Sequence, residues 1–88
     1  MRIEDFEQQL TAILQSAGPG TVAELTDTAI AYWNGIHLVY AEIDIDGTGA
    51  LTGTFEMNAQ RWAQWKDWLS DWLTDPVISV RHDLSRAN

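Results

Sequence analysis

The sequence predicts a two-layer α+β sandwich, in which two helices cover one face of an antiparallel meander in the order α-β-β-β-α-β. Apolar residues recur at helical spacing near the start of the chain and again over residues 59–73. The residues between these two segments alternate apolar and polar side chains around glycine-containing turns, which is typical of a meander. With 88 residues, the chain is expected to form a single domain, residues 1–88.

The first helix is indicated by apolar residues spaced three and four apart, namely Ile3, Phe6, Leu10, Ile13, Leu14 and Ala17. The acidic residues Glu4 and Asp5 suit the positive end of the helix dipole. Gly18-Pro19-Gly20 is expected to end the helix, because glycine tolerates a left-handed cap and proline cannot continue the hydrogen-bond ladder.

Residues 21–33 carry two conflicting patterns. Thr21 followed by Glu24 matches a helical capping box, which would begin a helix ending at Asn34-Gly35. The same Asn-Gly pair lies between two segments rich in β-branched and aromatic residues, and it predicts a two-residue type I′ hairpin turn. We favour the hairpin for residues 26–33, and a helix over residues 21–33 stays open as the alternative.

The two predicted turns assign the strand residues to two faces of the sheet. A turn at Asn34-Gly35 places Ile30 opposite Val39, and a second turn at residues 47–49 places Ala41 opposite Phe55. The face expected to pack against the helices is apolar and carries Ile30, Val39, Ala41, Ile43, Ile45, Leu51, Phe55 and Met57. The face expected to point away from the helices, the outer face, carries Asp27, Trp33, Ile36, Leu38, Tyr40, Glu42, Asp44, Thr52, Thr54 and Glu56.

The second helix is expected over residues 59–73, with Asn58 as its N-cap. Trp68 lies at the border of its apolar stripe, which consists of Trp62, Trp65, Leu69, Trp72 and Leu73. A tryptophan-rich stripe at this spacing is typical of a core, because each ring buries a large apolar area. After Asp75-Pro76, residues 77–84 predict a fourth strand that joins an edge of the sheet.

Charge and composition narrow the function classes. The chain has 13 acidic against 5 basic residues, a net charge of -8 and no cysteine. Such a charge repels the phosphate backbone, so no nucleic-acid partner is expected. No apolar stretch approaches 18 residues and the first residues do not resemble a signal peptide, so a cytoplasmic protein without a membrane partner is expected. The absence of cysteine excludes disulfides, thiol nucleophiles and zinc-thiolate sites.

The binding surface predicted from the sequence is the outer face, because it combines aromatic side chains with carboxylates. Its expected partner-binding residues are Asp27, Trp33, Leu38, Tyr40, Glu42, Asp44 and Glu56. Tryptophan and tyrosine recur at binding hot spots, and acidic residues favour a basic partner. We therefore expect a non-enzymatic module that binds a basic protein surface, as inhibitors, immunity proteins and nucleic-acid mimics do. The alternative is a homodimer that closes through the same face.

No catalytic residue or cofactor is expected, because neither His37 nor His82 lies within a spacing pattern of a nucleophile and its base. One segment, residues 44–52, resembles the calcium-binding loop of the EF-hand family. Asp44, Asp46 and Thr48 match its first, third and fifth positions, and the resemblance implies that they would supply oxygen ligands. The twelfth position, where that family has a bidentate Glu, is occupied by Phe55. As a hairpin turn, the same segment needs no metal.

Overall fold

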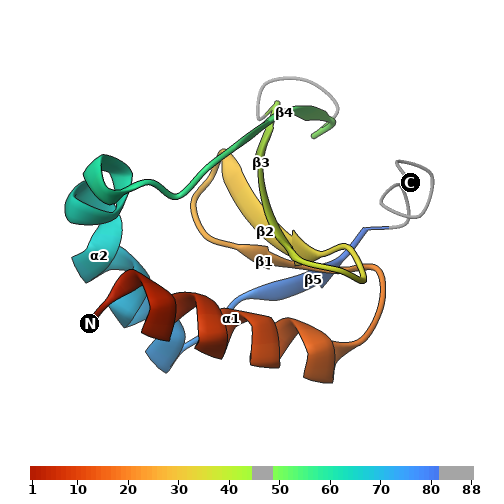
Figure 1. Cartoon of the computed structure of the whole chain (residues 1–88). Coiled ribbons are helices and arrows are strands. Elements are labelled where there is room, and N and C mark those ends of the chain that lie inside the picture. The colour runs from red at the N-terminus through yellow and green to blue at the C-terminus, as the bar shows by residue number, and fades with distance from the viewer. Residues whose placement is uncertain (45–48, 82–88) are drawn as a thin grey trace.

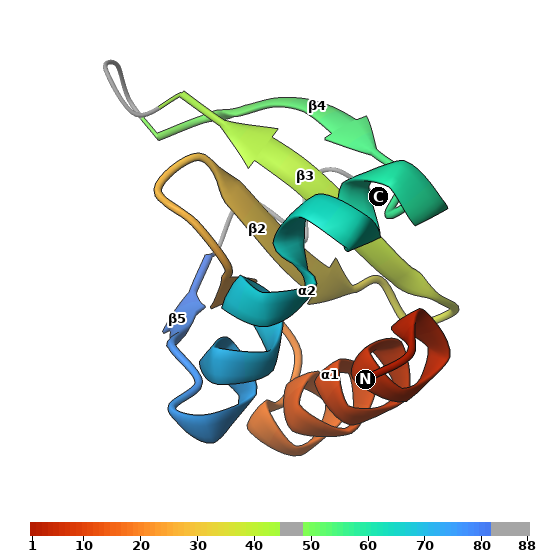
Figure 2. The same cartoon turned by 90° about the vertical axis from the view of Figure 1, so that its left-hand side faces the viewer.

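Two helices and a five-stranded antiparallel sheet make up the described part of the chain, residues 1–44 and 49–81 of a computed structural model. In chain order the elements are α1 (Ile3–Ala17), β1 (Thr21–Glu24), β2 (Ala29–Trp33), β3 (Leu38–Ile43), β4 (Leu51–Phe55), α2 (Ala59–Thr74) and β5 (Ile78–Val80). The strands lie in the order β4-β3-β2-β1-β5, and both helices lie on the same side of the sheet (Figures 1 and 2). The predicted two-layer α+β class is therefore confirmed.

Both helices follow the sequence prediction closely. α1 ends at Gly18, whose φ of 98° is left-handed and whose N–H donates to the Leu14 carbonyl at 3.1 Å. α2 begins after Asn58, whose side-chain oxygen accepts a hydrogen bond of 2.8 Å from the Arg61 N–H. Within the described residues, neither helix is long and apolar enough to cross a membrane. Their buried side chains are Phe6, Leu10, Leu14, Trp62, Leu69 and Trp72.

The described residues contain one strand more than predicted, because residues 21–33 form two strands joined by a turn. β1 pairs with β2 on one side and with β5 on the other. The N–H groups of Leu25 and Thr26 both donate to the Ala29 carbonyl and close the turn between β1 and β2. The alternative of a helix over residues 21–33 is therefore wrong, and the favoured strand is confirmed for Ala29–Trp33.

β5 joins the sheet at an edge, as predicted for the last strand. It pairs antiparallel with β1, where Ser79 lies opposite Val22. It is shorter than the predicted strand over residues 77–84, of which residues 82–84 lie outside the described part of the chain.

The connection between β2 and β3 is longer than the predicted two-residue turn. Trp33 lies opposite Leu38, so residues 34–37 form the loop. As a result Ile30 pairs with Ala41 instead of Val39. This shift of two residues changes the pairing partners and leaves every side chain on the same side of its strand, because side chains alternate with a period of two.

Asn34 is the physical reason for the longer loop. A type I′ turn would need positive φ at Asn34, but in the described residues only glycines have positive φ, Gly35 at 100° among them. The Asn34 side-chain oxygen instead accepts hydrogen bonds of 2.8 Å from the N–H groups of both Ile36 and His37. These bonds satisfy the loop backbone and stabilise the four-residue connection.

The predicted assignment of the two sheet faces is wrong for β2 and β3. Trp33, Leu38 and Tyr40, which were expected on the outer face, pack into the main core beneath the helices. Val39 lies on the outer face with Ala41, because side chains two apart share a face. The outer face carries its own apolar cluster, which consists of Val22, Ile30, Ala41, Tyr32, Ile43 and Leu51.

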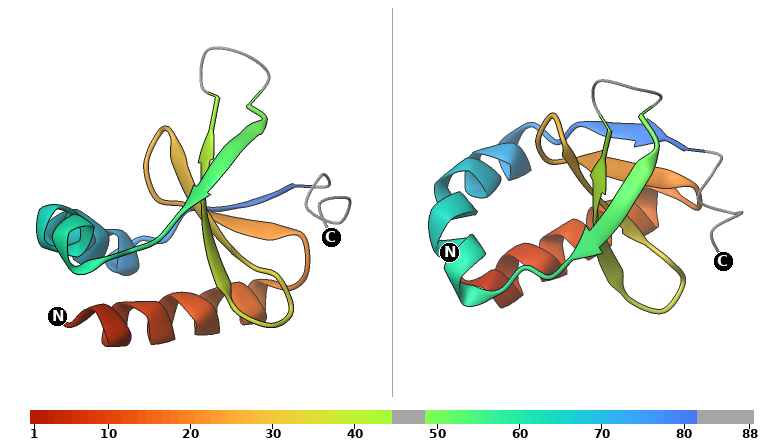
Figure 3. Two further views of the ribbon diagram at one scale, coloured as in Figure 1. Left: turned by 45° about the horizontal axis from the view of Figure 1, so that its top comes forward. Right: turned by 90° about the horizontal axis from the view of Figure 1, so that it is seen from above.

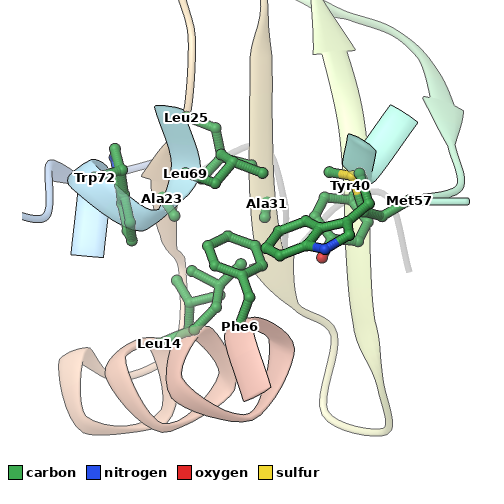
Figure 4. Close-up of a cluster of buried hydrophobic side chains, with 11 residues drawn as sticks. Phe6, Leu14, Ala23, Leu25, Ala31, Tyr40, Met57, Leu69 and Trp72 are labelled. Carbon is green, nitrogen blue, oxygen red and sulfur yellow. The ribbon is translucent and has the colours of Figure 1, made fainter. Parts of the chain in front are cut away.

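Side-chain volume explains why the helices cover the other face. Ala23 and Ala31, both 0% exposed, occupy its centre. Figure 4 shows Phe6, Leu69 and Trp72 gathered around these two alanines. A close-packed core needs small residues opposite large ones, so the alanines leave the room that the bulky helix residues require.

The apolar side chains of the outer face are buried because the sheet is strongly twisted. β3 and β4 turn steeply across the direction of β1 and β5 (Figure 3). Val22 and Ile30, at 1% exposed, and Ala41, at 0%, are therefore buried on the face that neither α1 nor α2 covers.

β3 and β4 also pair differently from the prediction. Phe55 lies opposite Tyr40 instead of Ala41, and the register shifts between Glu42 and Ile43. A register shift of this kind changes the strand pairing by one residue, so the side chains beyond it point to the opposite face of the sheet. Phe55 therefore packs against the main core. Its predicted position on the helix-covered face is confirmed, although its pairing partner differs.

Candidate functional site

The residues predicted to form one binding surface are divided by the structure. Trp33, Leu38 and Tyr40 lie under or beside the helices. The acidic members of the predicted set are exposed, namely Asp27, Glu42, Asp44 and Glu56. The seven residues therefore do not share the outer face of the sheet, while their role in binding a partner or in closing a homodimer stays a prediction.

Tyr40 links the sheet to α1. It is 4% exposed, and its hydroxyl donates a hydrogen bond of 2.8 Å to Glu7 Oε2. Burial, followed by this hydrogen bond and the negative charge of Glu7, raises the pKa of Tyr40 far above its usual value. The hydroxyl therefore remains a donor at neutral pH and fixes the direction of the Glu7 carboxylate.

A groove runs between α1 and the hairpin formed by β2 and β3. It consists of two adjoining cavities of about 490 and 720 Å³, which share Gln15 and Trp33 as lining residues. We call it the hairpin groove. Its helix wall carries Glu4, Glu7, Gln8, Thr11, Leu14 and Gln15, and its hairpin wall carries Tyr32, Trp33, Asn34, Ile36, His37 and Leu38.

The hairpin wall of the groove combines the apolar side chains of Trp33, Ile36 and Leu38 with the polar side chains of Asn34 and His37. Trp33 and Leu38 are half-buried and pack against the main core on their inner side. Ile36 at the loop tip is 80% exposed and lies beside Leu38 and Trp33 on this wall, so the three side chains form one apolar rim. The bonds that Asn34 makes to the loop backbone hold Ile36 in place.

The helix wall of the groove is polar and acidic. Glu7 faces it with one oxygen engaged by Tyr40, and Glu4 makes an exposed ion pair of 3.5 Å with Arg2. Exposed pairs of this kind contribute little to stability, so Glu4 can exchange Arg2 for another cation at small cost. This wall therefore favours a positively charged occupant.

The helix wall is the part of the site that the sequence analysis missed. Glu4, Gln8, Thr11 and Gln15 follow one another at spacings of four, three and four. This is the spacing of one helix face, and a polar stripe at that spacing was available as a signal. A polar stripe on an amphipathic helix is ordinarily exposed to solvent, and only the position of the hairpin turns it into a wall.

Arg81 connects the two ends of the sheet near the outer face. It follows β5, and its Nη2 donates a hydrogen bond of 2.8 Å to the carbonyl of Gly49, which precedes β4. Its backbone N–H also donates to the Gly20 carbonyl at 2.7 Å. Because β4 and β5 are the outermost strands, the hydrogen bond from Arg81 to Gly49 links the start of one edge strand to the end of the other.

The suggested calcium loop is only partly covered by the described residues. Asp44 is exposed, while Asp46 and Thr48 lie outside them. Within the described part of the chain, no group of three His, Asp or Glu side chains is placed to hold a metal ion. Calcium binding at residues 44–52 is therefore not decided by this geometry.

Comparison of the chain with known protein families, with curated proteins and with solved structures returns no match. The chemistry of the hairpin groove is therefore the guide to function. It offers an exposed aliphatic anchor, a half-buried indole and carboxylates on the opposite wall, which together suit binding of an amphipathic cationic chain.

Proposed function

We propose that this chain is a small, acidic, non-enzymatic interaction module that binds a basic segment of a partner protein in the hairpin groove. The observation that carries the proposal is the position of Ile36, 80% exposed on the rim opposite the wall that carries Glu4 and Glu7. The partner segment would carry apolar side chains toward the hairpin and Lys or Arg toward α1. A cytoplasmic setting is part of the same proposal.

Apolar contact would supply most of the affinity. Ile36 lies at the entrance of the groove, with Leu38 and Trp33 deeper in its wall. Trp33 and Leu38 are half-buried, so they lose little conformational entropy on binding and their burial converts efficiently into affinity.

Charge would supply selectivity. The net charge of -8 attracts a basic partner at long range, and the groove carboxylates fix its orientation. Because Glu7 already accepts a hydrogen bond from Tyr40, it is held in position before a partner arrives. Binding should therefore weaken as salt is raised.

The test is an NMR titration of the ¹⁵N-labelled chain with two designed peptides. One alternates Leu and Lys, and the matched control has Glu in place of every Lys. We expect the Leu-Lys peptide alone to shift the amide signals of α1 and of residues 32–38. Shifts scattered over the whole surface, or equal shifts with both peptides, would contradict the proposal.

A pair of variants tests whether Ile36 anchors the bound peptide. Ile36→Ser should weaken binding of the Leu-Lys peptide about tenfold, because it removes a buried aliphatic side chain. Val80→Ser is the matched control, since Val80 is 62% exposed on β5, outside the residues that line the groove. Equal affinities for the two variants would show that Ile36 is not an anchor.

Self-association is the competing hypothesis, and it is tested by the mass in solution. A constant 9.9 kDa over a concentration series leaves the groove open to another protein. A doubled mass that Ile36→Ser returns to 9.9 kDa would identify a second copy of this chain as the occupant instead.

A further inference from the structure

Trp68 is exposed and yet fixed in position. Its side chain is 62% exposed, while its indole Nε1–H donates a hydrogen bond of 2.8 Å to the Leu25 carbonyl. An indole that is tied down in this way cannot turn into the core, so its ring remains presented to solvent. The main core is already filled by Trp62, Leu69 and Trp72 from the same helix.

Trp68 lies beside a hollow of about 380 Å³ between α2 and the turn that follows β1. Trp72 forms part of its lining and donates from Nε1 to the Glu24 carbonyl at 2.8 Å. The Glu24 N–H in turn donates to the Val77 carbonyl at 2.9 Å. Hydrogen bonds thus join three segments of the chain around this hollow, which we call the Trp68 hollow.

The surroundings of the Trp68 hollow are acidic. Glu24 and Asp27 line it, and no Lys, Arg or His is among its described lining residues. Asp71 is exposed one helical turn after Trp68, on the same side of α2. Both indole N–H groups are engaged with backbone carbonyls, so the two indoles present aromatic surface to a ligand, beside the carboxylates of Glu24 and Asp27.

We propose that the Trp68 hollow binds an arginine side chain of a partner protein. A guanidinium group is planar, stacks on an indole and donates several hydrogen bonds in one plane, which matches an exposed ring beside carboxylates. A lysine ammonium is a more strongly hydrated point charge and gains less from the ring. This site is independent of the proposed groove function, since the two lie at opposite ends of β2: the hollow at the turn before it, the groove at the loop after it.

The experiment follows the indole signals of the ¹⁵N-labelled chain during titration with oligo-arginine, oligo-lysine and oligo-citrulline peptides of equal length. Citrulline has the shape of arginine without its charge. We expect oligo-arginine to shift the Trp68 indole signal and the Asp27 amide, oligo-lysine to bind more weakly, and oligo-citrulline to leave both signals unchanged. Equal binding of arginine and lysine peptides with shifts spread over all acidic surfaces would overturn the proposal.

Three variants distinguish the contribution of the Trp68 ring to oligo-arginine binding from the contribution of general negative charge. Trp68→Leu should weaken oligo-arginine binding about two- to fivefold, as expected for loss of an exposed cation–π contact. Asp27→Asn should weaken it as well, whereas Asp5→Asn on α1, an equal change of charge, should not. If Asp27→Asn and Asp5→Asn have the same effect, the proposal is overturned even where Trp68→Leu fails to fold.

The same variants distinguish this proposal from the proposed function. Ile36→Ser should leave oligo-arginine binding at Trp68 unchanged, and Trp68→Leu should leave the Leu-Lys peptide bound in the groove. Loss of oligo-arginine binding in Ile36→Ser would assign the arginine to the groove and overturn the site at Trp68.

Discussion

The Tyr40 hydroxyl donates a hydrogen bond of 2.8 Å to Glu7 Oε2 and so joins β3 to α1 across the interface between the two layers. The two residues are 33 positions apart in the chain, and their contact exists only once the sheet has docked against the helix. It also orients a carboxylate that lines the hairpin groove.

Replacing Tyr40 with Phe should lower the free energy of unfolding by about 1–2 kcal/mol, because the variant keeps the buried ring and loses a hydrogen bond to a charged group. Urea unfolding followed by circular dichroism measures this difference. An unchanged midpoint would show that the bond does not hold the layers together.

The same variant should change how stability depends on pH. Burial and Glu7 raise the pKa of Tyr40 in the folded chain, while in the unfolded chain it stays near 10. Stability that depends on neutral Tyr40 is therefore fully present below about pH 10 and falls by about 1.4 kcal/mol per pH unit above it. Tyr40→Phe should show a flatter decline in that range, and parallel curves for the two proteins would contradict the expectation.

Leu69→Ala should destabilise the chain more than Trp65→Ala. Leu69 is 0% exposed in the main core, so its truncation leaves a cavity and should cost about 2–5 kcal/mol. Trp65 is half-buried and packs its edge on the Phe55 ring at 5.9 Å between centroids, so solvent can fill part of the space it leaves. The unfolding midpoints of the two variants show which one is less stable. A larger loss of stability for Trp65→Ala would show that the core is not centred on Leu69.

Ala31→Leu tests the assignment of the sheet faces. Ala31 is 0% exposed beneath the helices, and added volume there should cost about 1–3 kcal/mol or more through overpacking. The control is Ala50→Leu, at an exposed position before β4, which should change stability by less than about 0.5 kcal/mol. Similar melting temperatures for both variants would mean that the helices do not cover Ala31.

Asn34→Ala should loosen the loop that presents Ile36. The variant removes the acceptor of two hydrogen bonds of 2.8 Å, from the N–H groups of Ile36 and His37, at a cost of about 1 kcal/mol. Both amides should exchange with solvent faster, as measured by hydrogen exchange. Asn34→Asp keeps an acceptor and should retain their protection; faster exchange in both variants would point to another stabiliser.

The helices could be predicted from the sequence because their signals are local. Gly18 ends α1 and Asn58 begins α2 through contacts within a few residues, which a spacing pattern can detect. The stripe that contains Trp62 and Leu69 also depends only on helical periodicity. The position of Trp68 at the border of that stripe follows from the same rule.

The sheet faces could not be predicted in the same way, because both faces are apolar. Ile30 and Ala41 indicated a buried face correctly, but burial there comes from the twist of the sheet and not from the helices. What selects the helix-covered face is the volume of the partner side chains, which fit over Ala23 and Ala31. Volume matching between distant segments leaves no periodic signal in the chain.

The candidate site was only partly predictable for a related reason. Trp33 and Leu38 were expected at a binding surface, and both line the groove. Glu7 was not expected there, because its role depends on contact with Tyr40 across the two layers. The four-residue loop that exposes Ile36 depends on hydrogen bonds of one side chain, and the Asn-Gly pair alone predicted a shorter turn.

The hydrogen bond from Arg81 to Gly49 should also make the chain less prone to aggregate. β4 and β5 are the strands to which a foreign strand could add, and exposed straight edges are the usual starting points of fibrous assembly. Arg81 joins the end of one edge strand to the start of the other, and this link should hinder the addition of a foreign strand there. We therefore expect resistance to aggregation to depend in part on a side chain that belongs to neither apolar cluster.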